Sequence, residues 1–169
     1  YFSSYSDSFV NAAGSLVDRL VDRFDLDGSS HVLEIASNDG YLLQHYVAKG
    51  IPCLGIEPAQ NVATVAQARG VPTRVDYFTE SLADRLASEG LSADIVHANN
   101  VLAHVPDLNG MVRGLEAVLK PGGSAVLEVP YVRDLVEKGA FDTIYHEHVY
   151  YFSCGALASL FEKHGMNLY

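Results

Sequence analysis

Residues 32–43, with the sequence VLEIASNDGYLL, join an apolar strand pattern to a tight turn and the start of a helix. The first four residues are mostly apolar or β-branched, whereas residues 36–40 are small or polar types that suit a turn or a helix N-cap. Leu42 and Leu43 then resume an apolar pattern at helical spacing. In open α/β sheets a ligand binds at such a junction, outside the carboxyl end of a strand and against a helix N-terminus. The stretch therefore predicts a cofactor loop, and the other segments can be placed relative to it.

Apolar strand patterns alternate with helical patterns over most of the chain. Strands are expected at residues 32–35, 53–57, 71–75, 93–98 and 124–129, and helices at 8–24, 41–48, 61–69, 81–88, 108–119 and 156–164. This alternation, without internal repeats, predicts a doubly wound α/β fold with a mostly parallel sheet. Residues 166–169 are expected to begin a further strand.

The length of 169 residues is that of one domain. Residues 1–30 are interpreted as an N-terminal arm and a helix that pack on a core formed by residues 31–169. The arm, residues 1–8, is expected to pack on the surface; the alternative is that Tyr1 or Tyr5 closes over a bound ligand. Because the first residue is Tyr1 rather than Met, the chain is interpreted as a fragment of a longer protein.

The charge balance argues against two classes of partner. The chain has 11 Lys and Arg against 21 Asp and Glu, which gives a formal charge of -10. Nucleic acids and anionic membranes require concentrated cationic side chains, so neither is an expected partner. The two cysteines, Cys53 and Cys154, have no companions at metal-ligand spacing, so no metal site or disulfide framework is expected. With no run of 18 apolar residues and no signal-peptide pattern, a cytoplasmic location is expected.

The turn after the first strand departs from the dinucleotide fingerprint G-x-G-x-x-G. Only Gly40 is present, and Ala36 and Asn38 stand where glycines would allow close approach of a pyrophosphate. No cationic residue lies nearby in the sequence. A ligand without phosphate, which carries an adenosine and a charged amino-acid tail, therefore fits the turn better.

An acid followed by alternating small residues resembles the first motif of class I methyltransferases, which have a Rossmann-like sheet and use S-adenosylmethionine. The resemblance implies a cofactor loop made of Glu34, Ala36, Ser37, Asn38 and Gly40. Glu34 would hold the amino group of the cofactor, directly or through water. The product left after methyl transfer would be S-adenosylhomocysteine.

The same resemblance assigns the rest of the cofactor site. Glu57, followed by Pro58, ends the second expected strand and would accept both ribose hydroxyls with its two carboxylate oxygens. The alternative for Glu57 is an exposed acid at a strand end. Asp76 and Phe78 would surround the adenine ring, Phe78 by packing and Asp76 by accepting from the amino group.

Two asparagines, Asn99 and Asn100, close the fourth expected strand in ANNVLAHVPD. By resemblance they lie beside the methyl donor, and the alternative is a buried capping role. The stretch LKPGGSAVLEV at residues 119–129 is similar to the turn into the fifth strand of this fold.

Acid and base groups gather in residues 140–153, AFDTIYHEHVYYFS. Methyl transfer to a carbon needs a base that removes a proton next to a carbonyl and leaves an enolate. In a strand Tyr145 and Glu147 share one face, whereas in a helical turn Tyr145 and His148 do. In either case a carboxylate lies close to an imidazole and could fix its tautomer. His104, just beyond the fourth strand, would face the same mouth of the sheet.

Four segments together, ASNDGYLL, ANNVLAHVPDL, LEVPYV and FDTIYHEHVYYFS, resemble the sugar C-methyltransferases, which methylate C-3 of a dTDP-4-keto-deoxysugar in antibiotic sugar biosynthesis. The resemblance covers nearly the whole chain. It implies that His148 abstracts the proton and that Glu147, Tyr145 and His104 support the base or the enolate. His146 is expected to point away.

Members of this family are usually longer on both sides, with a zinc-binding domain before the core and a Rossmann-like domain after it. We therefore expect this chain to be truncated at both ends, to bind S-adenosylmethionine, and to need flanking domains for full turnover of a dTDP-keto-sugar. Three alternatives remain open: an O- or N-methyltransferase of another small metabolite, a non-catalytic cofactor-binding module, and a nicotinamide oxidoreductase.

Overall fold

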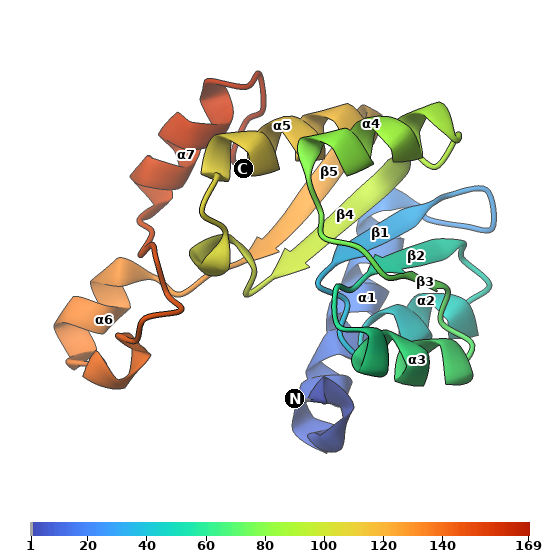
Figure 1. Ribbon diagram of the computed structural model, residues 1–169, viewed down its shortest axis with the longest axis horizontal. Helices are drawn as coiled ribbons and strands as arrows, with labels where there is room; N and C mark the ends of the chain where they lie inside the picture. Colours follow the sequence, from blue (N-terminus) through green and yellow to red (C-terminus); the bar gives the residue numbers. More distant parts are fainter. Residues whose placement is uncertain (1) are drawn as a thin grey trace.

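A five-stranded sheet, parallel throughout, forms the centre of the molecule (Figure 1). The computed structural model describes residues 2–169. Its strands are β1 (Val32–Ile35), β2 (Cys53–Ile56), β3 (Thr73–Arg74), β4 (Ala93–Asn99) and β5 (Leu119–Glu128). The strand order β3-β2-β1-β4-β5 reverses direction beside β1, which confirms the predicted doubly wound fold. The C-terminal end of β1 therefore lies at the switch point of the sheet.

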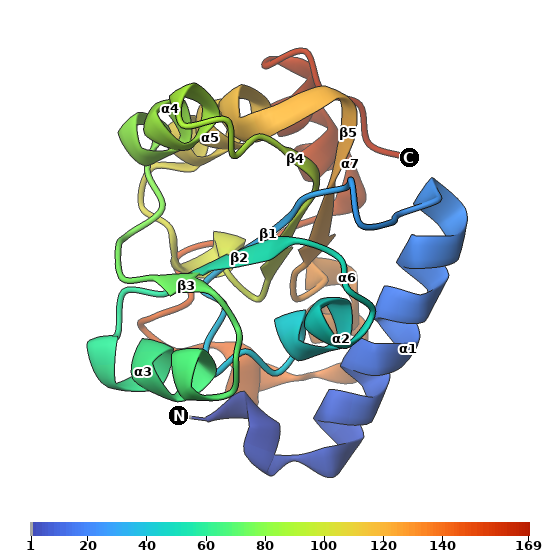
Figure 2. The ribbon, with the colours of Figure 1, turned by 90° about the vertical axis from the view of Figure 1, so that its right-hand side faces the viewer.

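Helices cover both faces of the sheet (Figure 2). One face carries α1 (Asp7–Phe24), α2 (Leu43–Ala48) and α3 (Gln60–Ala68), and the other carries α4 (Glu80–Ser88), α5 (Leu108–Val118) and, beyond α5, α7 (Cys154–Glu162). Strand β1 divides the core, because Val32 packs toward α1 and α2 whereas Leu33 and Ile35 pack toward α4 and α5. All four residues of β1 are buried. Such strands read as continuous apolar runs, which is why β1 could be predicted.

Side-chain caps fix where several helices begin. The hydroxyl of Ser6 accepts a hydrogen bond from the backbone N–H of Phe9 at the start of α1. Thr79 and Asp107 cap α4 and α5 in the same way, and Ser153 caps α7. Each cap satisfies a backbone donor that the helix itself leaves free.

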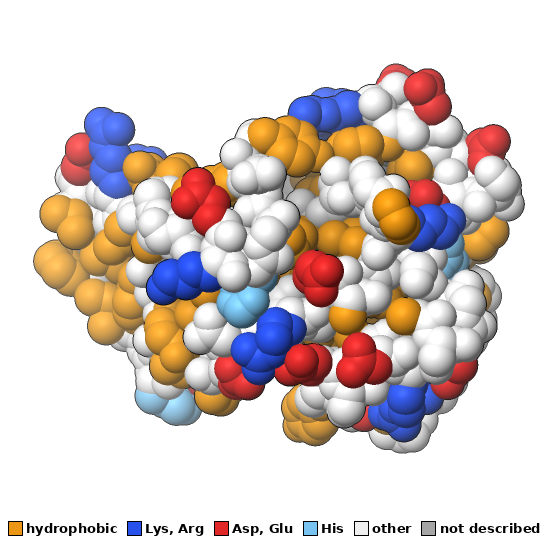
Figure 3. All heavy atoms as spheres, turned by 90° about the horizontal axis from the view of Figure 1, so that it is seen from above, with side chains coloured by type: hydrophobic (Ala, Val, Ile, Leu, Met, Phe, Trp, Pro, Cys, Tyr) orange, Lys and Arg blue, Asp and Glu red, His pale blue; other side chains and the backbone are white. Residues whose placement is uncertain are grey.

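The segment after β5 leaves the sheet. It contains α6 (Val132–Lys138) and a 3₁₀ turn at Phe141–Thr143, and it returns through an isolated bridge between Tyr131 and Phe152. Figure 3 shows hydrophobic side chains gathered at the end of the molecule where α6 lies. In this segment Val136 and Phe141 have exposed fractions of 70% and 72%.

Most boundaries differ from the sequence predictions by one or two residues, and β3 is reduced to Thr73–Arg74 from the expected residues 71–75. Helix α2 begins at Leu43 instead of residue 41, because the turn after β1 is longer than its sequence suggests. Strand β5 begins at Leu119, which pairs with Ala93 of β4, and the register shifts before pairing resumes at Ser124. Residues 166–169 form no strand, and this expectation is wrong: the segment contacts β5 through side chains, with the Tyr169 hydroxyl 2.7 Å from the Ser124 hydroxyl. Tyr1 lies outside the described residues, and Tyr5 is 80% exposed.

Among residues 2–169, no helix is long and apolar enough to cross a bilayer.

Candidate active site

The cofactor loop joins β1 to α2 along a backbone path that normally takes glycine. Ala36, Asn38 and Gly40 have φ angles of 54°, 52° and 79°. A left-handed backbone costs an ordinary residue roughly 1–2 kcal/mol, and asparagine tolerates it better than alanine. All three alternating positions therefore follow the path that glycines would follow, although only Gly40 is a glycine.

Glu34 lies in the middle of the sheet with only 1% of its surface exposed. Its register partners are Gly55 on β2 and His97 on β4. Burial raises the pKa of this carboxyl well above its ordinary value, and the nearby carboxylates of Glu57 and Asp39 raise it further.

Three buried polar atoms around this position have no hydrogen-bond partner among residues 2–169: Glu34 Oε2, Ser37 Oγ and His97 Nδ1. Buried polar groups are rarely left without a hydrogen-bond partner, and a buried carboxyl oxygen without a partner lowers the stability of the fold. A cationic group, bound water or both at this position would satisfy these atoms.

Glu57 connects the end of β2 to the cofactor loop. Its Oε2 accepts from the backbone N–H of Asn38 at 3.0 Å, and its Oε1 accepts from the backbone N–H of Ala59 at 2.8 Å. The side chain is 7% exposed, so the alternative of an exposed strand-end acid is wrong. Each carboxylate oxygen keeps a second lone pair that could accept a ligand hydroxyl.

A cleft of about 830 Å³ lies beside the carboxyl ends of β1, β2 and β4. This volume is in the range of small-molecule sites. Five of the predicted site residues line the cleft: Ala36, Pro58, Phe78, Asn100 and His104. The rest of its wall is largely apolar and includes Ile35 and Met111.

The other ten predicted site residues do not line this cleft, and Asp76 and Asn99 are the two of them held farthest from their predicted roles. The carboxylate of Asp76 pairs with Arg85 at 3.2 Å and accepts from the backbone N–H of Tyr77 at 2.9 Å. Asn99 faces the opposite side of the sheet, where it lines a smaller hollow of about 340 Å³ together with Tyr41. Side chains alternate along a strand, so only Asn100, just beyond β4, reaches the cleft.

His148 sits in a hydrogen-bonded cluster next to the cleft. Its Nδ1 lies 2.9 Å from the carbonyl oxygen of Thr143, and its Nε2 lies 2.7 Å from the hydroxyl of Tyr145. A carbonyl only accepts, so Nδ1 carries the proton, and Nε2 offers a lone pair to the hydroxyl. The ring centroid is 4.8 Å from that of His104, which lines the cleft. The imidazole is therefore oriented by two hydrogen bonds, with Nε2 directed toward the Tyr145 hydroxyl.

The predicted carboxylate does not orient this imidazole. The nearest imidazole paired with Glu147 is that of His146, at 3.9 Å, and the His146 side chain is 91% exposed. The backbone carbonyl of Thr143 sets the tautomer in place of the carboxylate. Sequence reasoning missed Thr143 because a backbone acceptor leaves no signature in residue type. His146 points away, as expected.

Two backbone hydrogen bonds hold the segment that carries His148 in place. The backbone N–H of Val149 donates to the carbonyl of Ala103 at 2.8 Å, and the N–H of Val132 donates to the carbonyl of Phe152 at 2.9 Å. The first bond places His148 beside the turn that carries His104. Among the described residues, no group of three or more His, Cys, Asp or Glu side chains could hold a metal ion.

Comparisons with known proteins agree with this geometry. A family model described as a methyltransferase domain matches residues 8–169. The C-methyltransferase NovU of Streptomyces niveus is 38% identical over 168 residues, which cover 99% of this chain and 40% of NovU. A ubiquinone biosynthesis O-methyltransferase of Xanthomonas oryzae pv. oryzae is 32% identical over 113 residues, which cover 66% of this chain and 47% of that protein.

A solved S-adenosylmethionine-dependent methyltransferase from Archaeoglobus fulgidus has the same fold. Its TM-score is 0.67 at 18% identity, over 90% of this chain and 68% of that chain. The chain spans less than half the length of the two curated relatives it matches. The family match, the parallel sheet and the cleft at its switch point agree, and the chain belongs to the S-adenosylmethionine-dependent methyltransferases.

Proposed function

We propose that the chain is the core of a C-methyltransferase that transfers a methyl group to a carbon next to the ketone of a nucleotide-linked keto-deoxysugar, through an enolate. The observation that carries the proposal is the orientation of the His148 imidazole, with Nδ1 bonded to the Thr143 carbonyl and Nε2 directed toward the Tyr145 hydroxyl. The likeness to NovU, a C-methyltransferase, supports a carbon acceptor. The proposal places the protein in deoxysugar and antibiotic biosynthesis, in the cytoplasm.

The cleft fits S-adenosylmethionine, which supplies an electrophilic methyl group on a sulfonium when bound. The unpartnered carboxyl oxygen of Glu34 suits the cationic amino group, and the free lone pairs of Glu57 suit the ribose hydroxyls. Phe78 would pack on the adenine in the apolar part of the cleft. Asp76, now paired with Arg85, would have to turn to reach the adenine amino group.

Asn100 is the better candidate of the asparagine pair for the methyl side. It lines the cleft, and its side-chain amide donates to Glu128 at 3.0 Å, which fixes its orientation. Asn99 would act from the other face by supporting the end of β4.

In the acceptor half, His148 Nε2 takes the proton from the carbon next to the ketone. The bond between that carbon and its proton breaks, its electron pair passes to the enolate, and the imidazole becomes imidazolium. Tyr145 occupies Nε2 through its hydroxyl and must move aside, which frees that hydroxyl to donate to the enolate oxygen. His104, whose ring lies 4.8 Å from that of His148 at an interplanar angle of 60°, is a second donor for the same oxygen. Glu147 would favour the imidazolium through its charge.

The nucleotide half of the substrate needs other parts of the longer protein. The chain spans 40% of the length of NovU. Its exposed apolar surface around α6 and its acidic charge offer little to a diphosphate. We expect the chain alone to bind the cofactor and to transfer methyl slowly.

Hydrogen–deuterium exchange tests the base without methyl transfer. The longer protein, incubated in D₂O with a dTDP-4-keto-deoxysugar and S-adenosylhomocysteine, should exchange the proton next to the ketone. His148→Asn should slow this exchange and the methylation by about 10²–10⁴-fold. His146→Asn is the matched control, since this exposed imidazole lies two positions away. Unchanged exchange in His148→Asn would remove that residue from the mechanism.

The O-methyltransferase relative favours a second function, transfer to a hydroxyl. There His148 would deprotonate the hydroxyl, and no exchange next to a ketone would occur. NMR of the product separates the two, because a C-methyl couples to the carbon skeleton and leaves the hydroxyls free.

A further inference from the structure

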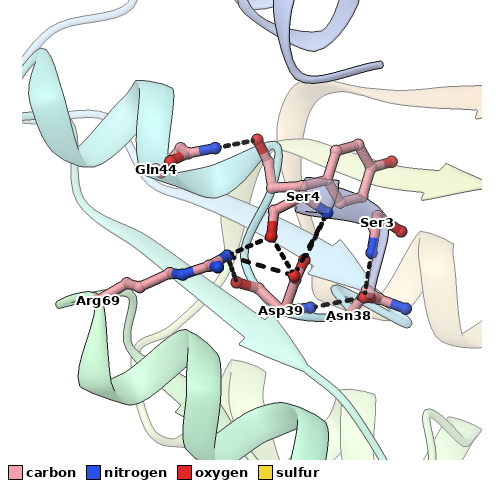
Figure 4. Close-up of polar contacts among 7 residues, drawn as sticks. Ser3, Ser4, Asn38, Asp39, Gln44 and Arg69 are labelled. Carbon is pink, nitrogen blue, oxygen red and sulfur yellow. Dashed lines mark hydrogen bonds and ion pairs between the residues drawn. The ribbon is translucent and has the colours of Figure 1, made fainter. Parts of the chain in front are cut away.

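The N-terminal arm is bonded to the cofactor loop (Figure 4). The backbone N–H of Ser3 donates to Asn38 Oδ1 at 3.0 Å, and the backbone N–H of Ser4 lies 3.3 Å from both carboxylate oxygens of Asp39. The Ser4 hydroxyl also donates to Asp39 Oδ2. Two adjacent loop residues thus accept hydrogen bonds from two adjacent arm residues, each 35 positions earlier in the chain.

A third element completes this contact. Arg69, at the C-terminal end of α3, places Nη1 3.2 Å from Asp39 Oδ2, 3.3 Å from the Asp39 carbonyl and 2.7 Å from the Ser4 hydroxyl. The Asp39 side chain is 0% exposed, whereas that of Arg69 is 37% exposed. A buried carboxylate without its partner is strongly destabilising, so the loop depends on both Ser4 and Arg69 for this charge.

The contact continues into the cofactor site. Asn38 Oδ1 accepts from the Asp39 N–H at 2.9 Å as well as from the arm, and the Asn38 N–H donates to Glu57 at 3.0 Å. Asn38 also holds a left-handed φ of 52°, which is favourable only where neighbours hold it. Displacement of Asp39 would therefore shift the N–H that orients Glu57.

We propose that Asp39 and Arg69 are positioning residues for the cofactor, and that the arm, fastened through Ser4, holds the cofactor loop in its binding conformation. This inference rests on the proposed S-adenosylmethionine site. Among the described residues, those that line the cleft include neither Asp39 and Arg69 nor Asn38 and Glu57. Asp39 and Arg69 act on Glu57 through Asn38, and Glu57 is followed by Pro58, which does line the cleft. An ordered arm then raises the affinity for the cofactor, and bound cofactor makes the arm more ordered by the same free energy.

Calorimetric titration of the chain with S-adenosylhomocysteine tests the coupling. Arg69→Met keeps the apolar stem and removes the charge, and Ser4→Ala removes the arm hydroxyl without leaving a charge unpaired. We expect each change to raise the Kd by about 5–20-fold. Arg74→Met is the matched control, because it removes an ion pair of similar geometry, Arg74 to Glu89 at 3.1 Å, whose side chains lie outside the loop. Its Kd should stay within about twofold of the wild type.

Two further readouts separate positioning from general destabilisation. Ser4→Ala and Arg69→Met act through the same carboxylate, so their effects on Kd should not add in the double variant. Chymotryptic cleavage after Tyr5, which is 80% exposed, should be slowed by S-adenosylhomocysteine in the wild type and in Arg74→Met, but not in Arg69→Met.

The outcomes distinguish this inference from the proposed function. If the wild type does not bind S-adenosylhomocysteine, the proposed cofactor site is refuted. If it binds, and both Ser4→Ala and Arg69→Met bind as tightly as Arg74→Met, the positioning role is refuted while the cofactor site stands.

Discussion

Replacement of His97 by Gln should make the folded chain more resistant to acid. His97 lies on β4 with 0% of its surface exposed, and its Nε2 is 2.9 Å from the hydroxyl of Tyr46. Burial lowers the pKa of this imidazole from its ordinary 6.5 to about 4. The folded chain therefore resists a proton that the unfolded chain accepts.

The size of the effect follows from this difference. A depressed pKa gives stability that is fully present above pH 6.5, declines as the pH falls, and is lost near pH 4. A shift of about 2.5 units, at about 1.4 kcal/mol per unit, corresponds to about 3 kcal/mol. The pKa of Glu34 is raised, so its effect on stability depends on pH in the opposite direction. The contribution of Glu34 to the free energy of unfolding is full below pH 4.5 and declines as the pH rises. Glu34 is present in both proteins, so the comparison isolates His97.

Urea unfolding of the wild type and His97→Gln at several values between pH 7 and pH 4 measures the effect. The difference in free energy of unfolding should move in favour of the variant by about 3 kcal/mol as the pH falls. His146→Gln, at a 91% exposed position, is the control and should follow the wild type. Parallel pH profiles for the wild type and His97→Gln would refute the reasoning.

Two backbone predictions can be tested by thermal unfolding. Ala36→Gly should raise the free energy of unfolding by about 1 kcal/mol, because φ is 54° at this exposed alanine, and the melting temperature should rise by about 2–4 °C; a lower melting temperature would contradict the strain. Gly55→Ala should lower the free energy of unfolding by about 1–3 kcal/mol, because its Cβ would lie 2.8 Å from the Cβ of Ser37. Gly155→Ala, which meets open space, is its control, and equal melting temperatures for these two variants would argue against the close approach.

The fold could be predicted from the sequence because most helices and strands are determined by residues close together in the chain. Strands β1, β2 and β4 are short and largely apolar, and the helices between the strands carry their own periodicity and caps. The failures occurred where the cause is not local. Residues 166–169 have a strand-like composition, but whether they pair depends on the neighbouring edge of β5.

Only part of the candidate site could be predicted from the sequence. Strand alternation alone would have separated Asn99 from Asn100, since Ala98 packs toward α5 and its neighbour must face the other way. The left-handed path at Ala36 could not be predicted, because alanine does not require it and the loop imposes it. The Thr143 carbonyl and the contact of Ser4 with Asp39 depend on three-dimensional approach and have no sequence signal.

The bridge between Tyr131 and Phe152 makes the segment that carries His148 a replaceable insert. The two ends of the segment meet at this bridge, and no strand of the sheet lies between the two residues. Mutations there can therefore accumulate without disturbing the loop between β1 and α2. On the proposed mechanism, changes in this segment would alter which acceptor is methylated while the loop that binds the cofactor keeps its structure.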